Sequence, residues 1–182
     1  MVSVEEIAAT PHGPSALRPV QHHIATEIER KFVAAAAVLP FCRSGTVLIQ
    51  GYLYTDPRNT IRVRRAGERA FLTWKGPKSG ASRKELEIEV PLPIGQALLA
   101  DVPSHARIQK IRYRIEHAGA VWDVDVFGGA LDGLILAEIE MAGEDQFVVL
   151  PPWVEQEVTA DARYRNSRLA AGVMPDGRLD TA

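Results

Sequence analysis

Charged side chains recur at strict two-residue spacing in seven segments of this chain, and this pattern constrains the fold more than any other feature. The first segment runs from Thr26 to Phe32 and carries Glu27, Glu29 and Lys31 at alternate positions. Successive side chains of a strand point to opposite faces, so residues i, i+2 and i+4 share one surface. A single strand of this kind is ordinary in an antiparallel sheet with one solvated face. Its repetition in seven segments needs a common explanation.

The charged positions form one set of nine carboxylates and eight basic groups. Its members are Glu27, Glu29, Lys31, Arg62, Arg64, Lys75, Arg83, Glu85, Glu87, Glu89, Lys110, Arg112, Arg114, Asp123, Asp125, Glu138 and Glu140. The intervening positions are apolar, apart from Arg30 and Lys84. Each predicted strand therefore has one ionic face and one apolar face.

The rest of the sequence predicts a mainly β domain with a few short helices. An alanine-rich run from Ala34 to Leu39, stopped by Pro40, predicts a short helix. Helical spacing of apolar residues predicts a second helix over 93–102, and a closing helix is predicted over 161–171. Residues 76–80 read as a hairpin loop without the spacing of a phosphate-binding Walker loop. Strands are predicted around 26–32, 47–55, 60–65, 70–75, 83–90, 107–116, 120–127 and 134–141.

The amphipathic helices decide which face of the sheet is enclosed. If the apolar face lined the interior of a barrel, these helices would have no apolar surface on which to dock. We therefore expect an α+β, mainly β fold: an eight-stranded antiparallel closed barrel with a charged lumen and helices packed on the outside. Residues 1–20, which contain several prolines and glycines, are expected to be a flexible N-terminal leader. Residues 21–182 are expected to form a single domain.

Composition limits the compartment and the partners. The single Cys42 has no partner for an internal disulfide, and no secretory signal or apolar run of membrane-spanning length is visible. We therefore expect a cytoplasmic protein without a membrane partner. A net charge of −2 provides no general basic field for nucleic acid. The basic run from Arg107 to Arg114 could form a nucleic-acid strip, but the acidic residues of neighbouring strands would oppose a polyanion there.

The mixture of charges in the lumen suggests a chemistry. Seventeen enclosed charges could simply pair with one another, which is the structural alternative. However, clustered Arg and Lys side chains clamp phosphate oxygens, and neighbouring carboxylates hold Mg²⁺ or Mn²⁺. Together these groups favour the binding of a polyphosphate with a divalent metal, and metal-assisted attack of water on a terminal phosphorus.

With these motifs in order, the chain resembles the CYTH domain, or triphosphate tunnel metalloenzyme, superfamily, and specifically its bacterial inorganic triphosphatase-like branch. The resemblance extends from about His23 to Ala171. It is carried by the segments 27–32, 61–64, 73–76, 83–89, 110–114, 123–125, 138–140 and 163–166. It implies hydrolysis or cyclisation of triphosphate-bearing substrates inside an eight-stranded tunnel, with Mg²⁺ or Mn²⁺.

The resemblance also implies roles for particular residues. The metal ligands would be Glu27, Glu29, Asp125, Glu138 and Glu140. The substrate-binding residues would be Lys31, Arg62, Arg64, Lys75, Arg83, Lys110, Arg112 and Arg114. The catalytic set would be Glu27, Glu29, Lys31, Glu87 and Glu89. Tyr164, Arg165 and Asn166 are expected either to cap one tunnel mouth or simply to pack there.

The leading hypothesis is hydrolysis of inorganic tripolyphosphate to pyrophosphate and phosphate. Three alternatives remain at this point: an adenylate cyclase of the class IV type, a thiamine or nucleoside triphosphatase, and a non-catalytic polyphosphate-binding module. The expected partner is a small-molecule triphosphate, and the sequence leaves a homodimer open.

Overall fold

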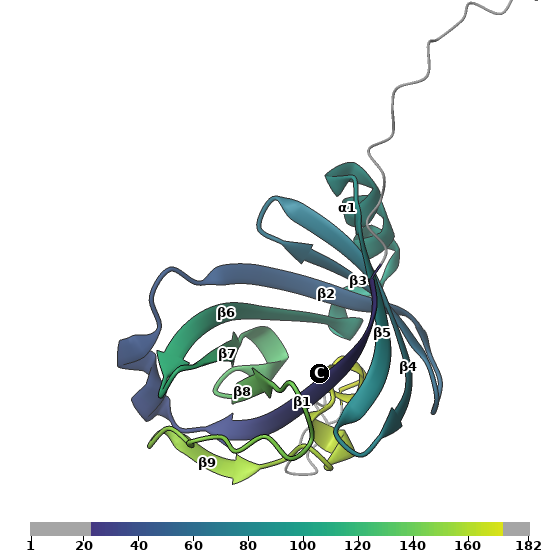
Figure 1. Ribbon diagram of the computed structural model, residues 1–182. Coiled ribbons are helices and arrows are strands. Elements are labelled where there is room, and N and C mark those ends of the chain that lie inside the picture. Colours follow the sequence, from purple (N-terminus) through teal and green to yellow (C-terminus); the bar gives the residue numbers. More distant parts are fainter. Residues whose placement is uncertain (1–22, 173–182) are drawn as a thin grey trace, which may run out of the picture.

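The computed structural model describes residues 23–172, so the leader predicted for residues 1–20 lies outside the described residues. Within these residues the chain forms nine strands and few helices (Figure 1). The strands are β1 (His23–Ala34), β2 (Thr46–Thr55), β3 (Thr60–Ala66), β4 (Arg69–Ser79), β5 (Ser82–Val90), β6 (Arg107–His117), β7 (Ala120–Phe127), β8 (Ile135–Glu140) and β9 (Val154–Glu157).

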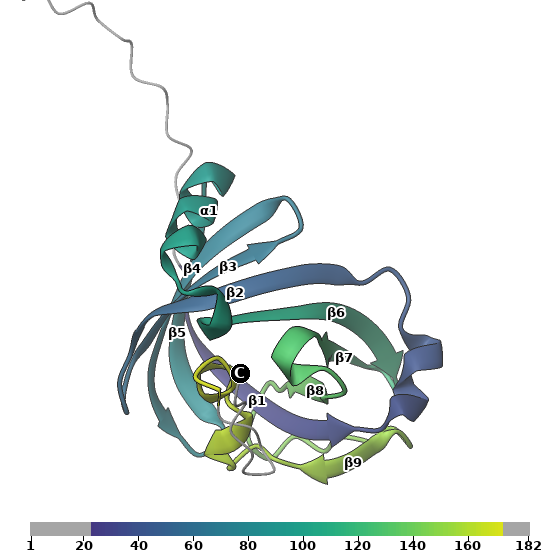
Figure 2. The same ribbon diagram turned by 180° about the vertical axis from the view of Figure 1, so that it is seen from behind.

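Eight of these strands close into an antiparallel barrel. The hydrogen-bonded order is β5-β4-β3-β2-β6-β7-β8-β1, and β1 pairs again with β5 to complete the ring. β1 closes it by pairing through residues 23–28 with β5 and through residues 29–33 with β8. The ring is visible from both sides in Figures 1 and 2. The predicted eight-stranded closed barrel is confirmed.

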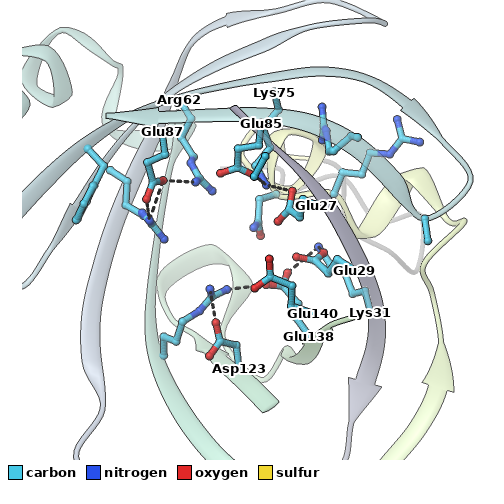
Figure 3. Close-up of a pocket in the computed structure, with 18 of the residues that line it drawn as sticks. Glu27, Glu29, Lys31, Arg62, Lys75, Glu85, Glu87, Asp123, Glu138 and Glu140 are labelled. Carbon is cyan, nitrogen blue, oxygen red and sulfur yellow. Dashed lines mark hydrogen bonds and ion pairs between the residues drawn. The ribbon is translucent and has the colours of Figure 1, made fainter. Parts of the chain in front are cut away.

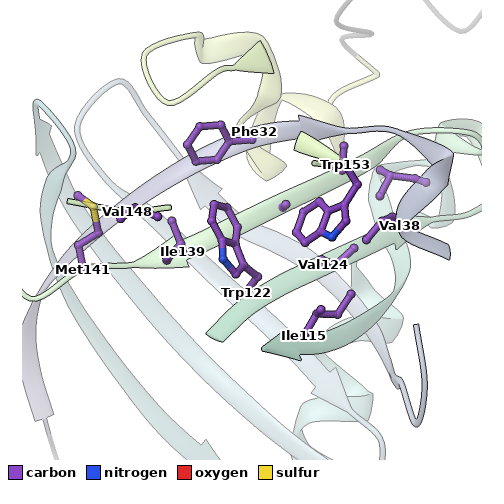
Figure 4. Packing of buried hydrophobic residues seen from close by; sticks show 12 residues of the cluster. Phe32, Val38, Ile115, Trp122, Val124, Ile139, Met141, Val148 and Trp153 are labelled. Carbon is purple, nitrogen blue, oxygen red and sulfur yellow. The ribbon is translucent and has the colours of Figure 1, made fainter. Parts of the chain in front are cut away.

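The apolar outer face of β1, β7 and β8 is covered by the segment that follows β8 and by η1 (Ala36–Phe41), a 3-10 helix. Trp122, which is fully buried, lies between Phe32 and Trp153 with ring centroids 5.5 and 5.6 Å apart (Figure 4). The edge-on arrangement of the two tryptophans is a favoured geometry for aromatic pairs. This cluster stabilises the part of the barrel wall formed by β1 and β8, the strands that carry Glu29 and Glu138.

A second covering layer is α1 (Leu92–Asp101), which packs across β3 and β4. Leu99 and Val102 bury themselves against Val63 of β3. Gly51 of β2 allows this close approach, since a Cβ there would lie 2.8 Å from the Val102 side chain. The predicted helix over 93–102 and its external position are both confirmed.

The lumen itself is partly filled by apolar side chains. Ile108, Phe127 and Leu136 lie on the same strand faces as the charged residues and form a buried cluster with Leu169 of α2 (Asn166–Leu169). The charged cavity therefore ends at this apolar cluster, which we call the apolar plug. Leu169 of the C-terminal helical turns contributes to it.

Four local predictions were wrong. Ala34 ends β1, and residues 36–41 form a 3-10 helix that contains Pro40; its turn bonds, from Val38 to Ala35 and from Cys42 to Leu39, do not need the missing proline N–H. The continuous helix over 161–171 is instead η4 (Ala162–Tyr164) and α2, separated by the extended Arg165.

The other two errors concern strands. Residues 76–79 belong to β4, which continues past an irregularity between Lys75 and Lys78, so the predicted loop is only a tight turn at Gly80. β9 was not predicted; it adds to β1 beyond the end of β5. No helix within residues 23–172 is long and apolar enough to cross a bilayer.

Candidate active site

The barrel encloses a cavity of about 1330 Å³ to which all eight ring strands contribute side chains (Figure 3). Every residue predicted to bind metal or substrate, or to act in catalysis, lines this cavity except Lys110 and Asp125. The alternating pattern of the sequence thus becomes a continuous ionic surface, because each strand turns the same parity inward.

One wall carries guanidinium groups around a single carboxylate. Arg64 of β3 lies 2.9 Å from both carboxylate oxygens of Glu87 on β5, and Arg62 lies 3.4 Å from one of them. Thr73 of β4 donates its hydroxyl to the same carboxylate at 2.7 Å. Burial alone would raise the pKa of Glu87, but Arg64, Thr73 and Arg62 outweigh it and lower the pKa. Glu87 therefore stays ionised and holds two phosphate-binding candidates in place.

A lysine bridges two further carboxylates beside this wall. Lys75 Nζ lies 2.7 Å from Glu27 on β1 and 2.6 Å from Glu85 on β5. Burial and the neighbouring Glu85 raise the pKa of Glu27 despite the attraction of Lys75, whereas the pKa of Glu85 is lowered. The two carboxylates compete for one ammonium group, and Glu27 is the one left less well stabilised.

The opposite wall is organised around Glu138 of β8. Its carboxylate lies 2.8 Å from Lys31 Nζ and 2.6 Å from Arg112, which also binds Asp123 at 2.9 Å. Burial opposes ionisation of Glu138, but Lys31 and Arg112 hold its pKa well below the ordinary value. In the same way, Glu138 and Glu29 raise the pKa of Lys31 against the effect of burial. Lys31 and Glu138 therefore form an ionised pair that Arg112 extends to Asp123.

Glu29 of β1 and Glu140 of β8 lie side by side on the cavity lining, where Glu140 is exposed to solvent. They are register partners. The pKa of Glu29 is raised by burial, by Glu138 and by Glu27, while Lys31, at 3.6 Å, only partly offsets this. Within the described residues, no Lys or Arg pairs with Glu140. This edge of the cavity carries an excess of carboxylate oxygen.

The carboxylate excess is chemically suited to a hard divalent cation, which prefers oxygen ligands. No group of three or more acidic, His or Cys side chains within residues 23–172 is arranged as a complete metal site. Mg²⁺ characteristically uses one or two carboxylates and completes its shell with water and substrate phosphates. Glu29 and Glu140, with Glu27 and Glu138 nearby, fit such a shared site, but they do not fit a closed protein cage.

Lys110 and Asp125 are placed differently from the expectation. Both are almost fully buried below the cavity surface, where the Lys110 ammonium binds Asp125 and Arg112 binds Asp125 at 2.6 Å. Burial lowers the pKa of Lys110 to about 8 although Asp125 opposes this. The structure presents this pair as a support beneath Arg112, outside the cavity lining.

Two predicted residues lie at the rim. Glu89 pairs with Arg69 in an exposed ion pair at 2.6 Å, and the side chain of Arg114 is 75% exposed. Both line the cavity, but water screens their charges far more than those of Glu138 or Lys31.

Several lining residues fall outside the predicted metal, substrate and catalytic sets. Of the three residues expected to cap or pack at one tunnel mouth, Arg165 and Asn166 line the cavity, whereas Tyr164 packs against the apolar cluster. Lys78 and Arg165 add positive charge at the C-terminal side: Lys78 Nζ donates only to the Thr159 carbonyl, at 3.1 Å, and Arg165 has no ion-pair partner within the described residues. Arg83 nearby donates to the Gly76 carbonyl at 2.8 Å. Lys78 was assigned to a loop, and only the continuation of β4 brings it inward. Glu85 and Asp123 lie at inward-facing positions of the sequence pattern, which predicts no role for them. Tyr52, Asn166 and Ser167 also line the cavity.

The comparisons with known proteins agree with this geometry. The CYTH domain model matches residues 25–169. An inorganic triphosphatase of Acetivibrio thermocellus is 37% identical over 143 residues, which cover 79% of this chain and 92% of that protein. One of Nitrosomonas europaea is 39% identical over 154 residues, covering 81% of this chain and 99% of that protein. A crystal structure of an inorganic triphosphatase superposes with a TM-score of 0.58 at 36% identity, over 81% of this chain and 96% of the other. The chain belongs to the CYTH domain family.

Proposed function

We propose that this protein is a metal-dependent triphosphatase that hydrolyses the terminal phosphoanhydride of inorganic tripolyphosphate, giving pyrophosphate and phosphate. The observation that carries the proposal is the enclosed lumen in which a wall of Arg and Lys side chains faces a carboxylate-rich edge at Glu29 and Glu140. The two relatives named inorganic triphosphatase, each covered over more than nine-tenths of its length, support the same activity.

The cationic residues supply binding and charge stabilisation. In phosphoryl transfer, negative charge spreads over the oxygens of the transferred group, and fixed cations stabilise that charge without reorganisation. Arg62, Arg64 and Arg112 are held in position by Glu87, Glu138 and Asp123, so their guanidinium groups are preorganised for phosphate oxygens. Water adds to the terminal phosphorus, the anhydride P–O bond breaks, and pyrophosphate leaves.

The carboxylates at the opposite edge would hold the divalent metal. Glu29 and Glu140 are the proposed ligands, with Glu27 and Glu138 close enough to orient water or to complete the shell. A bound Mg²⁺ or Mn²⁺ would neutralise phosphate charge and lower the pKa of coordinated water. Asp125 is not retained as a proposed ligand, because Lys110 and Arg112 already occupy its oxygens away from the cavity.

The test is a panel of substrates with either Mg²⁺ or Mn²⁺. Release of phosphate from tripolyphosphate, ATP, thiamine triphosphate and pyrophosphate would be measured, and the products from ATP would be separated. We expect the highest kcat/KM with tripolyphosphate. Formation of cyclic AMP would instead identify a cyclase, and tight binding of tripolyphosphate without turnover of any substrate would identify a binding module.

The location and assembly are also proposals. The single free Cys42 is in keeping with a reducing compartment, and we propose the cytoplasm. We retain the homodimer as a hypothesis, which light scattering of the purified protein would test.

A further inference from the structure

Gln50 and Tyr52 form a neutral polar pair on the lumen face of β2, among side chains that are otherwise mostly charged. Gln50 is completely buried, and its side-chain Nε2 donates to the Tyr52 hydroxyl at 3.2 Å. Tyr52 lies opposite Arg62 in the β2–β3 register and lines the cavity. The pair therefore connects the closed part of the lumen to the proposed substrate site.

The Tyr52 hydroxyl accepts a hydrogen bond from Gln50 and donates none within the described residues, so its hydrogen is available to a ligand. Burial raises the pKa of this hydroxyl, so it remains a proton donor at neutral pH. The charges that act on it are Arg62, Lys31, Glu138 and Arg83, which come from β3, β1, β8 and β5. Three of these four charges are cations, so the hydroxyl lies where a bound anion is favoured.

We infer that Tyr52 donates its hydroxyl hydrogen to a phosphate oxygen of the triphosphate, and that Gln50 is the positioning residue that keeps this hydroxyl in the donor orientation. The inference rests on the proposed function and adds a neutral contact to it. Lys31, Arg62 and Arg112 are already paired with carboxylates, whereas the Tyr52 hydrogen displaces no partner when phosphate arrives. Hydrogen bonds to charged acceptors are stronger than those between neutral groups.

The first variant is Tyr52→Phe, which removes the hydroxyl and keeps the ring in its apolar surroundings. Loss of one hydrogen bond to a charged group corresponds to about a 10- to 100-fold fall in kcat/KM for tripolyphosphate. Tyr54→Phe is the matched control: Tyr54 lies on the same strand and its hydroxyl donates to Asp56 in an exposed turn. It should leave kcat/KM within about twofold, as distant surface changes do. A Tyr52→Phe enzyme with wild-type kcat/KM would overturn the inference.

The role of Gln50 is tested by Gln50→Met, alone and in the Tyr52→Phe background. Gln50 Oε1 is buried without a partner among the described residues, so an unbranched apolar replacement removes an unsatisfied group. We expect the melting temperature to be unchanged or higher while kcat/KM falls, which a purely structural role would not produce. In the Tyr52→Phe background, Gln50→Met should have no further effect on kcat/KM. Equal losses in both backgrounds, or unchanged activity in Gln50→Met alone, would contradict the positioning role.

Calorimetric titration separates failure of this inference from failure of the proposed function. If the wild type hydrolyses none of the triphosphates, the proposed function fails. The Tyr52 contact is then judged by binding of tripolyphosphate, which Tyr52→Phe should weaken by about tenfold and Tyr54→Phe should not. Equal binding by both variants would overturn the contact even in an inactive protein.

Discussion

Glu29 and Glu87 both line the lumen, yet their surroundings shift their pKa values in opposite directions. Glu87 accepts from Arg62, Arg64 and Thr73, and its charge is compensated. Glu29 is surrounded by Glu138 and Glu27 in addition to Lys31, and its charge costs free energy in the folded state. At the scale of single residues, the ionised carboxylate of Glu87 stabilises the fold, whereas that of Glu29 destabilises it.

Glu29→Gln should separate function from stability. Because the pKa of Glu29 is raised above 4.5, the folded state binds this proton more tightly than the unfolded state, and the free energy of unfolding falls as the pH rises through and above 4.5. Removing the charge should therefore raise the melting temperature at pH 7. Turnover should fall by about 100-fold or more, since even outer partners of metal sites contribute about 10- to 100-fold. A variant with unchanged kcat would remove Glu29 from the proposed metal site.

Glu87→Gln should show the opposite stability effect. The lowered pKa means that ionised Glu87 stabilises the fold at pH values above 4.5, and that this contribution is lost as the pH falls through the lower folded-state pKa. We expect a loss of about 1 kcal/mol in the free energy of unfolding at pH 7, for a partly exposed network. Urea titrations at pH 7 and in acid should show the difference from wild type disappearing in acid. The control Glu89→Gln breaks an exposed pair with Arg69, which water screens, and should leave the urea midpoint unchanged at both pH values. An equal loss at both pH values would contradict the electrostatic explanation.

At the scale of elements, the segment that follows β8 covers the outer face of the strands that carry Glu29, Lys31 and Glu138. Trp153 is 3% exposed and contacts Trp122, while Arg30 forms a two-point ion pair with Glu157 of β9 at 3.0 and 2.6 Å. Thr159 continues this attachment by accepting from the Lys31 backbone N–H at 3.0 Å. The strand that carries Glu29 and Lys31 is thus held from its outer face.

Trp153→Ala should therefore weaken the barrel. Truncation of a buried tryptophan typically costs about 3–5 kcal/mol through lost burial and the cavity that remains. Phe147→Ala is the control in the same covering segment, since Phe147 is 87% exposed and should change the free energy of unfolding by less than about 0.5 kcal/mol. Urea unfolding followed by circular dichroism would measure both. Similar small losses in the two variants would show that the segment does not stabilise the wall.

The elements that sequence predicted and those it missed differ in their physical basis. Alternation at Glu27, Glu29 and Lys31 predicts a strand and identifies the face that points inward. A register shift of one residue would turn these side chains to the other face of the sheet. β9 is four residues long and its Glu-Gln-Glu has no apolar alternation, so only its pairing with β1 defines it as a strand. The helix predicted over 161–171 breaks at Arg165, whose backbone is extended, and the periodicity of apolar residues does not mark this break.

The same limit applies to the site. Parity correctly placed Arg62, Arg64 and Glu138 at the cavity, but parity does not specify depth along the barrel. Lys110 and Asp125 share the inward face, yet they lie where the apolar plug begins and bind each other. Tyr52 was not singled out because both faces of β2 carry apolar or aromatic residues, so its phase was not visible in the sequence.

At the scale of the whole molecule, the barrel is closed by strand pairing and its lumen charges are largely compensated within the chain. The remaining carboxylate excess is local, at Glu29 and Glu140. Bound triphosphate and metal should therefore stabilise the fold as a pair: the cation walls favour the anion, and the anion supplies the oxygens that complete the metal shell. The ring is closed by backbone pairing between strands, so we expect the barrel to persist when the metal is removed.

Removal of divalent metal should abolish hydrolysis without unfolding the protein. With EDTA, we expect no release of phosphate from tripolyphosphate and an unchanged melting temperature, and activity should return when Mg²⁺ is restored.

Tripolyphosphate and Mg²⁺ together, at about 100 times the dissociation constant, should add about 2.7 kcal/mol to the free energy of unfolding. Either one alone should add less, because Mg²⁺ then lacks its phosphate ligands, and the anion alone is repelled by Glu29 and Glu140. In Glu29→Gln the stabilisation by Mg²⁺ and tripolyphosphate together should fall to that of tripolyphosphate alone. Unfolding by EDTA would instead reveal a structural metal, and equal stabilisation of the variant by the pair would show that Glu29 does not hold the ion.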